Sequence, residues 1–212
     1  MRAIFFFFFK IFAIVALPFI CLIRGAIFLT EQHQLLPIMA IIGGIVGAAF
    51  VLAIYLLFFY GRLTGEVGSV RRKLYLALFV VALYGAHGLF FLSGNNVKHS
   101  SIQKEYTSLH PILRLSVSTI IHFDKSLIIT DANRQPEDYR KMGLKSKKHS
   151  LHYRQSSGYV HALDIRTKNR GMVRNFLLQT YFKLMGFNTL RHGGTGDHLH
   201  VSIKSQDRPN AI

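Results

Sequence analysis

The chain is short of cysteine and of acidic residues. Cys21 is the only cysteine among 212 residues, so no disulfide can form within the chain and cysteine usage indicates no redox compartment. Aspartate and glutamate number 10 against 26 lysines and arginines, which gives a net charge of +16. A strongly basic protein favours anionic partners such as cell-wall polymers, lipid headgroups or nucleic acids, although a solvated basic face explains the charge equally well. No sequence motif typical of nucleic-acid binding is present, so we expect no nucleic-acid partner.

Charge of either sign is also scarce in the first part of the chain. Residues 1–97 contain 7 Lys and Arg and 2 Asp and Glu, whereas residues 98–212 contain 19 and 8. Three apolar runs occupy about 3–29, 35–60 and 74–92, and each is long enough to cross roughly 30 Å of hydrocarbon. We predict a transmembrane region of three helices over 1–97, with membrane lipid as a partner. A cleaved signal peptide is the alternative for the first run, but no small-x-small cleavage site follows it.

The loops between the runs predict an orientation. The loop before the third run contains Arg62, Arg71, Arg72 and Lys73, whereas the loop before the second run contains no lysine or arginine. Positively charged loops stay in the cytoplasm. We therefore expect a multi-pass protein of the bacterial plasma (inner) membrane, with a cytoplasmic N-terminus and a periplasmic or extracellular C-terminal domain.

The remaining residues are typical of a small globular domain. Residues 98–106 are predicted to be a polar linker, and residues 107–212 an α+β domain with a small antiparallel sheet and helices. We expect one helix over about 109–121 and another over 171–185, which Gly186 ends. Strands are expected at 127–130, 159–167, 187–190 and 198–203, and a basic loop ends at His149. Six residues of the second helix are predicted to face inward: Val173, Phe176, Leu177, Tyr181, Leu184 and Met185.

Two separate segments hold residue types that bind metal. The segment 150–165, SLHYRQSSGYVHALDI, offers His152 and Asp164, and the segment 196–203, GDHLHVSI, offers His198 and His200. On a strand the latter two histidines share one face, so that one can bind a metal while the other acts beside it. His, Asp and His with one open position are what a mononuclear zinc site needs. His161 would point away from Asp164 and is interpreted as structural.

The order of these residues resembles the LAS group of zinc peptidases. That group includes lysostaphin, the D-Ala-D-Ala metallopeptidases and the hedgehog signalling domain, and its pattern is S-x-H-x-x-G-x-A-x-D with a late H-x-H. Five residues occur here in that order: Ser150, His152, Gly158, Ala162 and Asp164. The spacing departs from the pattern, because eleven residues rather than six separate His152 from Asp164. The late segment is similar to murein endopeptidases and D,D-carboxypeptidases of the group, and the resemblance covers roughly 107–204.

The resemblance implies a ligand set and a base. His152, Asp164 and His200 would bind Zn²⁺, and His198 would be the general base or the stabiliser of the developing oxyanion. No glutamate follows Glu137, so a histidine is the natural candidate for the base, although Glu137 itself stays open.

Four further residues receive roles from the same resemblance. Arg134 and Ser150 are expected at the substrate, where an arginine can donate two parallel hydrogen bonds to a peptide carboxylate. A surface charge for Arg134 and a turn hydroxyl for Ser150 are the alternatives. Asp197 is expected to orient a histidine from behind, and His192 is expected to be a further active-site histidine.

The sequence thus predicts a membrane-anchored zinc metallopeptidase that hydrolyses the peptide part of peptidoglycan. It leaves open whether the enzyme is a carboxypeptidase or an endopeptidase. Two alternatives remain: a non-catalytic, zinc-stabilised module that binds the cell wall, and a phage-type lysis protein. A fourth protein ligand, such as His161 or His192, would favour the structural zinc site.

Overall fold

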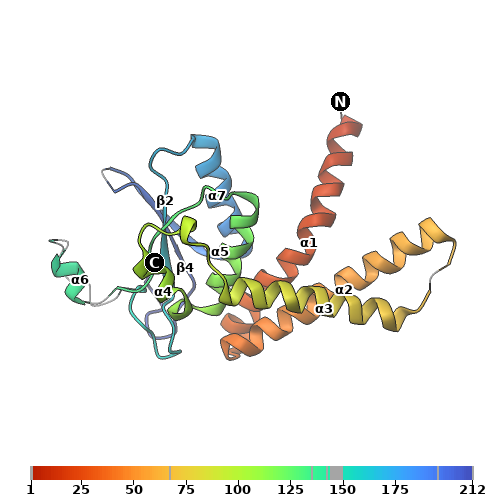
Figure 1. Cartoon of the computed structure of the whole chain (residues 1–212), viewed down its shortest axis with the longest axis horizontal. Coiled ribbons are helices and arrows are strands. Elements are labelled where there is room, and N and C mark those ends of the chain that lie inside the picture. Colours follow the sequence, from red (N-terminus) through yellow and green to blue (C-terminus); the bar gives the residue numbers. More distant parts are fainter. Residues whose placement is uncertain are drawn as a thin grey trace. The chain divides into compact units, whose positions relative to one another are not determined.

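The computed structural model describes residues 2–66, 68–134, 136–141, 143, 150–194 and 196–211. The chain divides into two compact units, Met1–His87 and Gly88–Ile212. Of the basic loop predicted to end at His149, residues 136–141 form a short helix, and residues 144–149 lie outside the described residues. Figure 1 shows three long helices at the N-terminal end of the chain and a sheet with shorter helices in the remainder.

The long helices are α1 (Arg2–His33), α2 (Pro37–Thr64) and α3 (Val70–Phe90). Each has the length and the composition to span a membrane, which confirms the predicted three-helix region. The helices are longer than the apolar runs by several residues, because helical hydrogen bonding continues into polar flanks such as Arg62 and Arg71.

Small residues let α1 and α2 approach closely. A Cβ atom on Gly44 would lie 2.3 Å from the carbonyl oxygen of Leu22, so only glycine fits at this position. Gly44 and Ala48 are both buried. Close backbone approach at small residues is a common way to join helices in lipid. Lipid tails are as apolar as the side chains, so burying apolar side chains between helices adds no hydrophobic stabilisation there.

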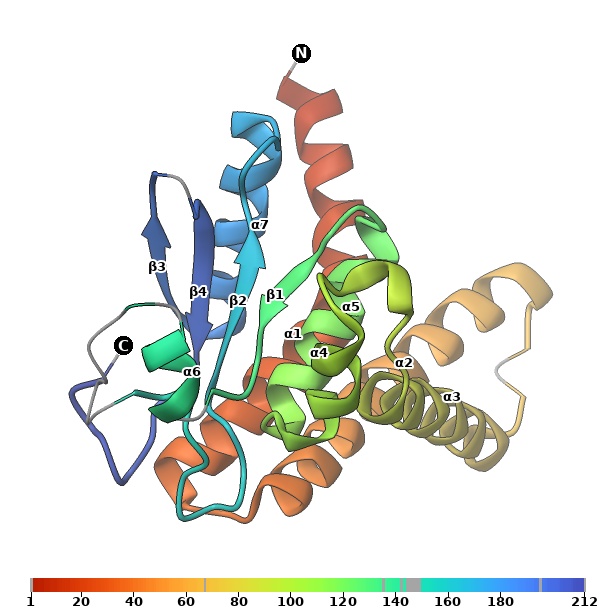
Figure 2. The same cartoon turned by 60° about the vertical axis from the view of Figure 1, so that its left-hand side comes forward.

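The second unit is built on a four-stranded antiparallel sheet, which confirms the predicted α+β arrangement (Figure 2). The strand order is β1-β2-β4-β3. The strands are β1 (Ile129–Asp131), β2 (Ala162–Arg166), β3 (Asn188–His192) and β4 (His198–Ser202). The helical elements are η1 (Gly94–Asn96), α4 (Ser100–Glu105), η2 (Tyr106–Ser108), α5 (Pro111–Phe123), α6 (Pro136–Lys141) and α7 (Met172–Met185).

The segment predicted as a linker, 98–106, belongs to this folded unit. It forms α4, and the side chains of Ile102 and Tyr106 are buried. Just before it, the Asn96 amide donates hydrogen bonds to the carbonyl oxygens of Lys125 and Leu127. These apolar and amide contacts hold the segment against the domain. A free linker would instead be exposed to solvent.

Strand register gives the sheet one polar face and one apolar face. Asp131 lies opposite Asp164, and Asp164 lies opposite His200, in neighbouring strands. Because side chains alternate along a strand, these residues point to one face and their neighbours to the other. Four neighbours on the second face are fully buried: Leu163, Ile165, Leu199 and Val201.

Helix α7 covers the apolar face, and its orientation corrects the sequence prediction. Gln179 hydrogen-bonds to Thr189, which shares a face with Val201. The residues that pack inward are Leu178, Phe182 and Met185, whereas four of the six predicted residues are exposed: Val173, Phe176, Leu177 and Leu184. The helix has two apolar stripes, and periodicity alone does not say which of them meets the sheet.

Candidate metal centre

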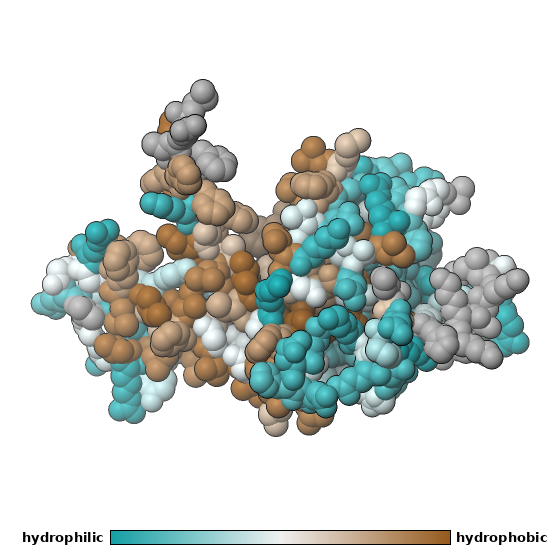
Figure 3. All heavy atoms as spheres, turned by 180° about the vertical axis from the view of Figure 1, so that it is seen from behind, coloured by the Kyte–Doolittle hydropathy of each residue, from teal (hydrophilic) through white to brown (hydrophobic). Residues whose placement is uncertain are grey.

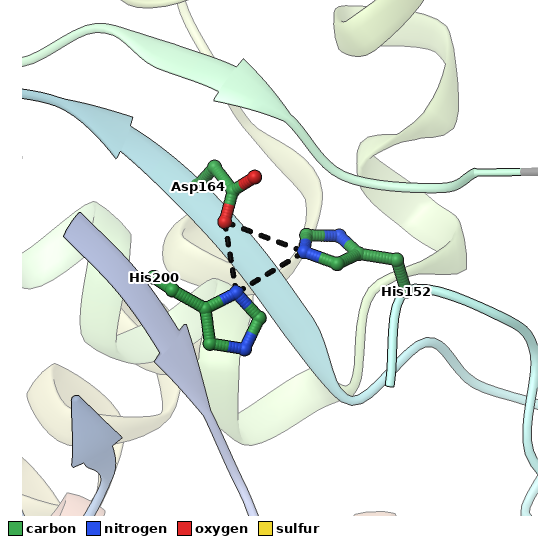
Figure 4. Close-up of side chains that lie close together, drawn as sticks. All are labelled: His152, Asp164 and His200. Carbon is green, nitrogen blue, oxygen red and sulfur yellow. Dashed lines mark hydrogen bonds and ion pairs between the residues drawn. The ribbon is translucent and has the colours of Figure 1, made fainter. Parts of the chain in front are cut away.

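Three buried side chains converge on the polar face of the sheet (Figure 4). His152 Nε2 lies 3.3 Å from Asp164 Oδ1 and 3.2 Å from His200 Nδ1, and the last two atoms are 2.9 Å apart. The relative exposures of the three residues are 3%, 2% and 6%, so bulk water contributes little to their solvation. The structure thus brings together the three residues that the sequence assigned to the metal.

Two of these residues are placed by the sheet itself. Asp164 on β2 and His200 on β4 are direct cross-strand partners. His152 arrives from a segment that folds back over the sheet, where its carbonyl oxygen accepts a hydrogen bond from the Arg134 amide. Gly158 has a φ of 79°, which suits glycine and allows the turn between His152 and β2.

Hydrogen bonds outside the cluster fix the tautomer of His152. Its Nδ1 lies 3.2 Å from the carbonyl oxygen of Ala132, which can only accept. The proton is therefore assigned to Nδ1, and the Nε2 lone pair points at Asp164 and His200. A proton on His200 Nδ1 would form one hydrogen bond, to Asp164 Oδ1. His152 Nε2 would still face a carboxylate oxygen with no proton between the two atoms. A cation satisfies all three edges of the triangle that these atoms form.

The triangle fits a zinc ion. Nitrogen and oxygen ligands about 2.0–2.1 Å from one tetrahedral ion lie about 3.3 Å from each other, close to the three observed separations. Two imidazoles and one carboxylate are also a donor set that catalytic zinc sites use. The hydrogen bond from His152 Nδ1 to a carbonyl oxygen is the usual support of a histidine ligand. The residues therefore fit a metal ion.

Asp164 is held in its ionised form. Burial by itself would raise its pKa, but the imidazoles of His152 and His200 lie close to the carboxylate and hold the pKa well below its usual value. The carboxylate thus carries a negative charge that a bound cation would neutralise.

Arg134 holds the ligand Asp164 instead of reaching for a substrate. Its Nη2 donates to Asp164 Oδ2 at 2.8 Å, and its Nε donates to Asp131 Oδ2 at 2.7 Å. Burial lowers the pKa of the guanidinium, but the two carboxylates raise this pKa by more, so the net shift is upward. These contacts indicate a positioning role for Arg134 and not the predicted role at the substrate. In this role, Arg134 binds Asp164 Oδ2, so that Asp164 Oδ1 faces the histidines.

Ser150 also has its partners within the protein. It is buried, its Oγ accepts a hydrogen bond from the His152 amide at 3.2 Å, and it lies 2.8 Å from the hydroxyl of Tyr139. Of the two interpretations given by the sequence, the turn hydroxyl that fixes the segment around His152 agrees with these contacts.

His198 lies beside the cluster and is partly open to solvent. Its Nδ1 is bonded to the carbonyl oxygen of Gly196, so the Nε2 lone pair faces the site, 3.6 Å from Asp164 Oδ2. The side chain is 26% exposed. His192 lies opposite it on β3, and the two rings stack with centroids 4.8 Å apart. His198 thus borders the cluster, and His192 contacts His198.

Asp197 does not hold a histidine ligand by a hydrogen bond. Its carboxylate accepts hydrogen bonds from Thr167 at 2.6 Å and from Arg191, and these bonds hold its pKa below the usual value. It joins the end of β2 to the hairpin of β3 and β4, and so positions His198 only through the backbone.

Sequence reasoning missed two residues that support the site. Asp131 pairs with Arg134 and lies 3.9 Å from His152 Nδ1, and Tyr139 on α6 contacts both Arg134 and Ser150. A carboxylate directly after a buried strand was a usable signal for Asp131. Helix α6 has only six residues and no apolar periodicity, so nothing in the sequence indicated Tyr139.

Comparisons with known proteins identify no relative of this chain. No family model matches it, and neither a curated protein nor a solved structure is significantly similar. The resemblance to LAS peptidases therefore remains a prediction that rests on the residues alone.

Proposed function

We propose that the protein is a membrane-anchored zinc peptidase that hydrolyses the peptide part of peptidoglycan outside the plasma membrane. One observation carries the proposal: the ligand atoms of His152, Asp164 and His200 converge with the separations that a tetrahedral zinc ion requires. A bound zinc ion would supply Lewis acidity, which lowers the pKa of water from 15.7 to about 7 and polarises a carbonyl.

His198 moves the proton in this proposal. Its Nε2 is the lone-pair nitrogen and lies at the edge of the cluster, where it can accept a proton from water and pass it to the leaving amine. Asp164 Oδ2, 3.6 Å away, stabilises the imidazolium that forms in between. The structure leaves Glu137 exposed and paired with Arg140 on α6, so it is the weaker candidate for the base.

An open metal position distinguishes an enzyme from a structural zinc site. Among the described residues the cluster has three protein ligands. His161, one candidate for a fourth, has its ring nitrogens bonded to Ser157 and to the carbonyl oxygen of Lys204. This supports the peptidase over the non-catalytic module.

The substrate class rests on two arguments. The resemblance to murein peptidases implies peptides with D-amino acids, and the +11 charge of residues 98–212 complements the carboxylates of peptidoglycan stems. The basic loop before α3 favours a cytoplasmic position for that loop, which supports an outer position for the second unit.

The test is hydrolysis of purified muropeptides by the full chain in detergent with zinc present. We expect products from the wild type and from His161→Gln, and none from His200→Ala. No product from the wild type, or equal rates for wild type and His200→Ala, would contradict the proposal.

A further inference from the structure

Helix α7 presents an apolar stripe to solvent. Its inner stripe packs on the sheet, while five residues on the opposite arc have relative exposures of 58–84%: Met172, Val173, Phe176, Leu177 and Leu184. Their spacing places them along one side of a helix about 21 Å long. Contiguous apolar surface of this kind marks contact with a protein or a membrane.

Basic residues border this outer stripe. Arg174 and Lys183 are both exposed, and helical spacing places them at opposite edges of the apolar arc. Figure 3 shows apolar side chains where α7 begins, within a surface of the second unit that is otherwise largely hydrophilic. An apolar face with a basic border is typical of a helix that lies in the plane of a membrane interface.

The chain enters the second unit next to this helix. Leu89, in the last turn of α3, accepts a hydrogen bond from Arg114 on α5 at 2.7 Å, and Gly88 packs against α5. On the same α5, Ser116 bonds to Tyr181 of α7. The end of a helix that fits a membrane span and helix α7 thus both contact α5.

Exposed aromatic residues lie at the ends of α3 and α5. Phe90 and Phe91, at the end of α3, have relative exposures of 75% and 56%. Phe123 at the end of α5 is also exposed, and the ion pair between Asp124 and Arg170 joins this end of α5 to the start of α7. Exposed aromatic side chains at the end of a membrane span are suited to the depth of the headgroups.

We propose that the outer stripe of α7 inserts into the interface of the membrane that the long helices enter, with Arg174 and Lys183 on anionic headgroups. The proposal does not depend on the peptidase activity. Because α7 covers the apolar face of the sheet and the metal cluster lies on the other face, this contact turns the cluster away from the bilayer. A polymer outside the membrane would then meet the cluster directly.

The chain contains no tryptophan, which permits a clean experiment. Phe176→Trp in the full chain is a single reporter on the outer stripe, and Leu177→Trp is a second one. Leu190→Trp is the matched control, since Leu190 is 43% exposed but lies on the sheet face of His200. Each variant is reconstituted into vesicles of phosphatidylcholine and phosphatidylglycerol with bromine on the acyl chains.

Insertion predicts that both stripe reporters emit further to the blue and lose intensity to the bromines, whereas the Leu190→Trp control does neither. Equal quenching of reporters and control would overturn the proposal. A blue shift at the stripe without quenching would also overturn it, because the stripe would then be covered by protein, either a second copy or the long helices.

The headgroup part has its own test. Arg174→Glu with Lys183→Glu, added to Phe176→Trp, should reduce the quenching in vesicles with phosphatidylglycerol and change it less in phosphatidylcholine alone. Unchanged quenching in both lipids would contradict a role for anionic headgroups.

Discussion

Two groups of buried histidines lie in the second unit and differ in what surrounds them. His152 and His200 share a carboxylate, because His152 Nε2 and His200 Nδ1 both face Asp164 Oδ1. His110 and His161 lie just as close, with ring centroids 4.9 Å apart and the rings edge to face. Among the described residues, no carboxylate hydrogen-bonds to either ring of that second pair, although the charge of Asp207 acts on His161.

The second pair has structural partners instead. His110 Nδ1 accepts a hydrogen bond from the Ile112 amide at the start of α5, and His161 bonds to Ser157 and Lys204. Burial lowers the pKa of both rings, so they stay neutral and stabilise the fold. Burial and proximity of two histidines alone therefore do not indicate a metal site. The first group is a candidate site because ring nitrogens of both histidines converge on a buried carboxylate.

The largest expected effect comes from His198, to which the proposed function assigns the proton transfer beside the first group. His198→Ala should lower the rate of muropeptide hydrolysis by about 10²–10⁴-fold while zinc remains bound. Rates and zinc content are measured on the same preparation. His161→Gln should keep its activity, and a similar loss in both variants would remove the distinction between the groups.

Metal removal should lower the free energy of unfolding of the chain only when the first group of histidines is intact. With free zinc at about 100 times its Kd, the gain in the free energy of unfolding is about 2.7 kcal/mol. Thermal unfolding of the full chain in detergent, with zinc and then with a chelator, measures this gain. It should be absent in His200→Ala and intact in His161→Gln; a gain in His200→Ala would place the ion elsewhere.

A smaller effect is expected from the second group. His161→Gln removes hydrogen bonds to Ser157 and Lys204, and it should lower the free energy of unfolding by about 0.5–1.5 kcal/mol. Chemical denaturation of the metal-free chain gives this value. Loss of zinc in the same variant would contradict the structural role.

The last effect concerns pH. The pKa values of His110 and His161 are lowered in the folded chain, so below pH 6.5 the unfolded chain binds more protons. Stability should be complete above pH 6.5 and fall as the pH drops, by at most about 1.4 kcal/mol per pH unit for each ring. His161→Gln should make this decline shallower, and an identical pH profile would argue against a buried neutral His161.

The sequence predicted the parts of the fold that local patterns determine. Long apolar runs gave the three helices, and Gly186 ended α7 as expected, with a φ of 102°. It could not decide which stripe of α7 meets the sheet, because Val173 and Phe176 are as apolar as Leu178 and Phe182. The same limit applied to residues 98–106, whose burial depends on distant contacts.

The site was predictable where spacing reflects strand geometry. Alternation on β4 predicted His198 and His200 on one face, whereas the pairing of β2 with β4, which puts Asp164 opposite His200, is seen only in the structure. The supporting contacts were not predictable, because Arg134, Asp131 and Tyr139 meet only in the folded chain. Arg134 was therefore assigned to a substrate, although a buried carboxylate holds it.

Metal analysis of the full chain tests the central claim most directly. Purified protein dialysed against a weak chelator should retain about one zinc ion per chain, with nitrogen and oxygen neighbours at about 2.0–2.1 Å by X-ray absorption. Asp164→Ala and His200→Ala should lose the ion, and His161→Gln should retain it. A wild-type chain without bound metal, or ligand variants that bind as much as the wild type, would contradict the account.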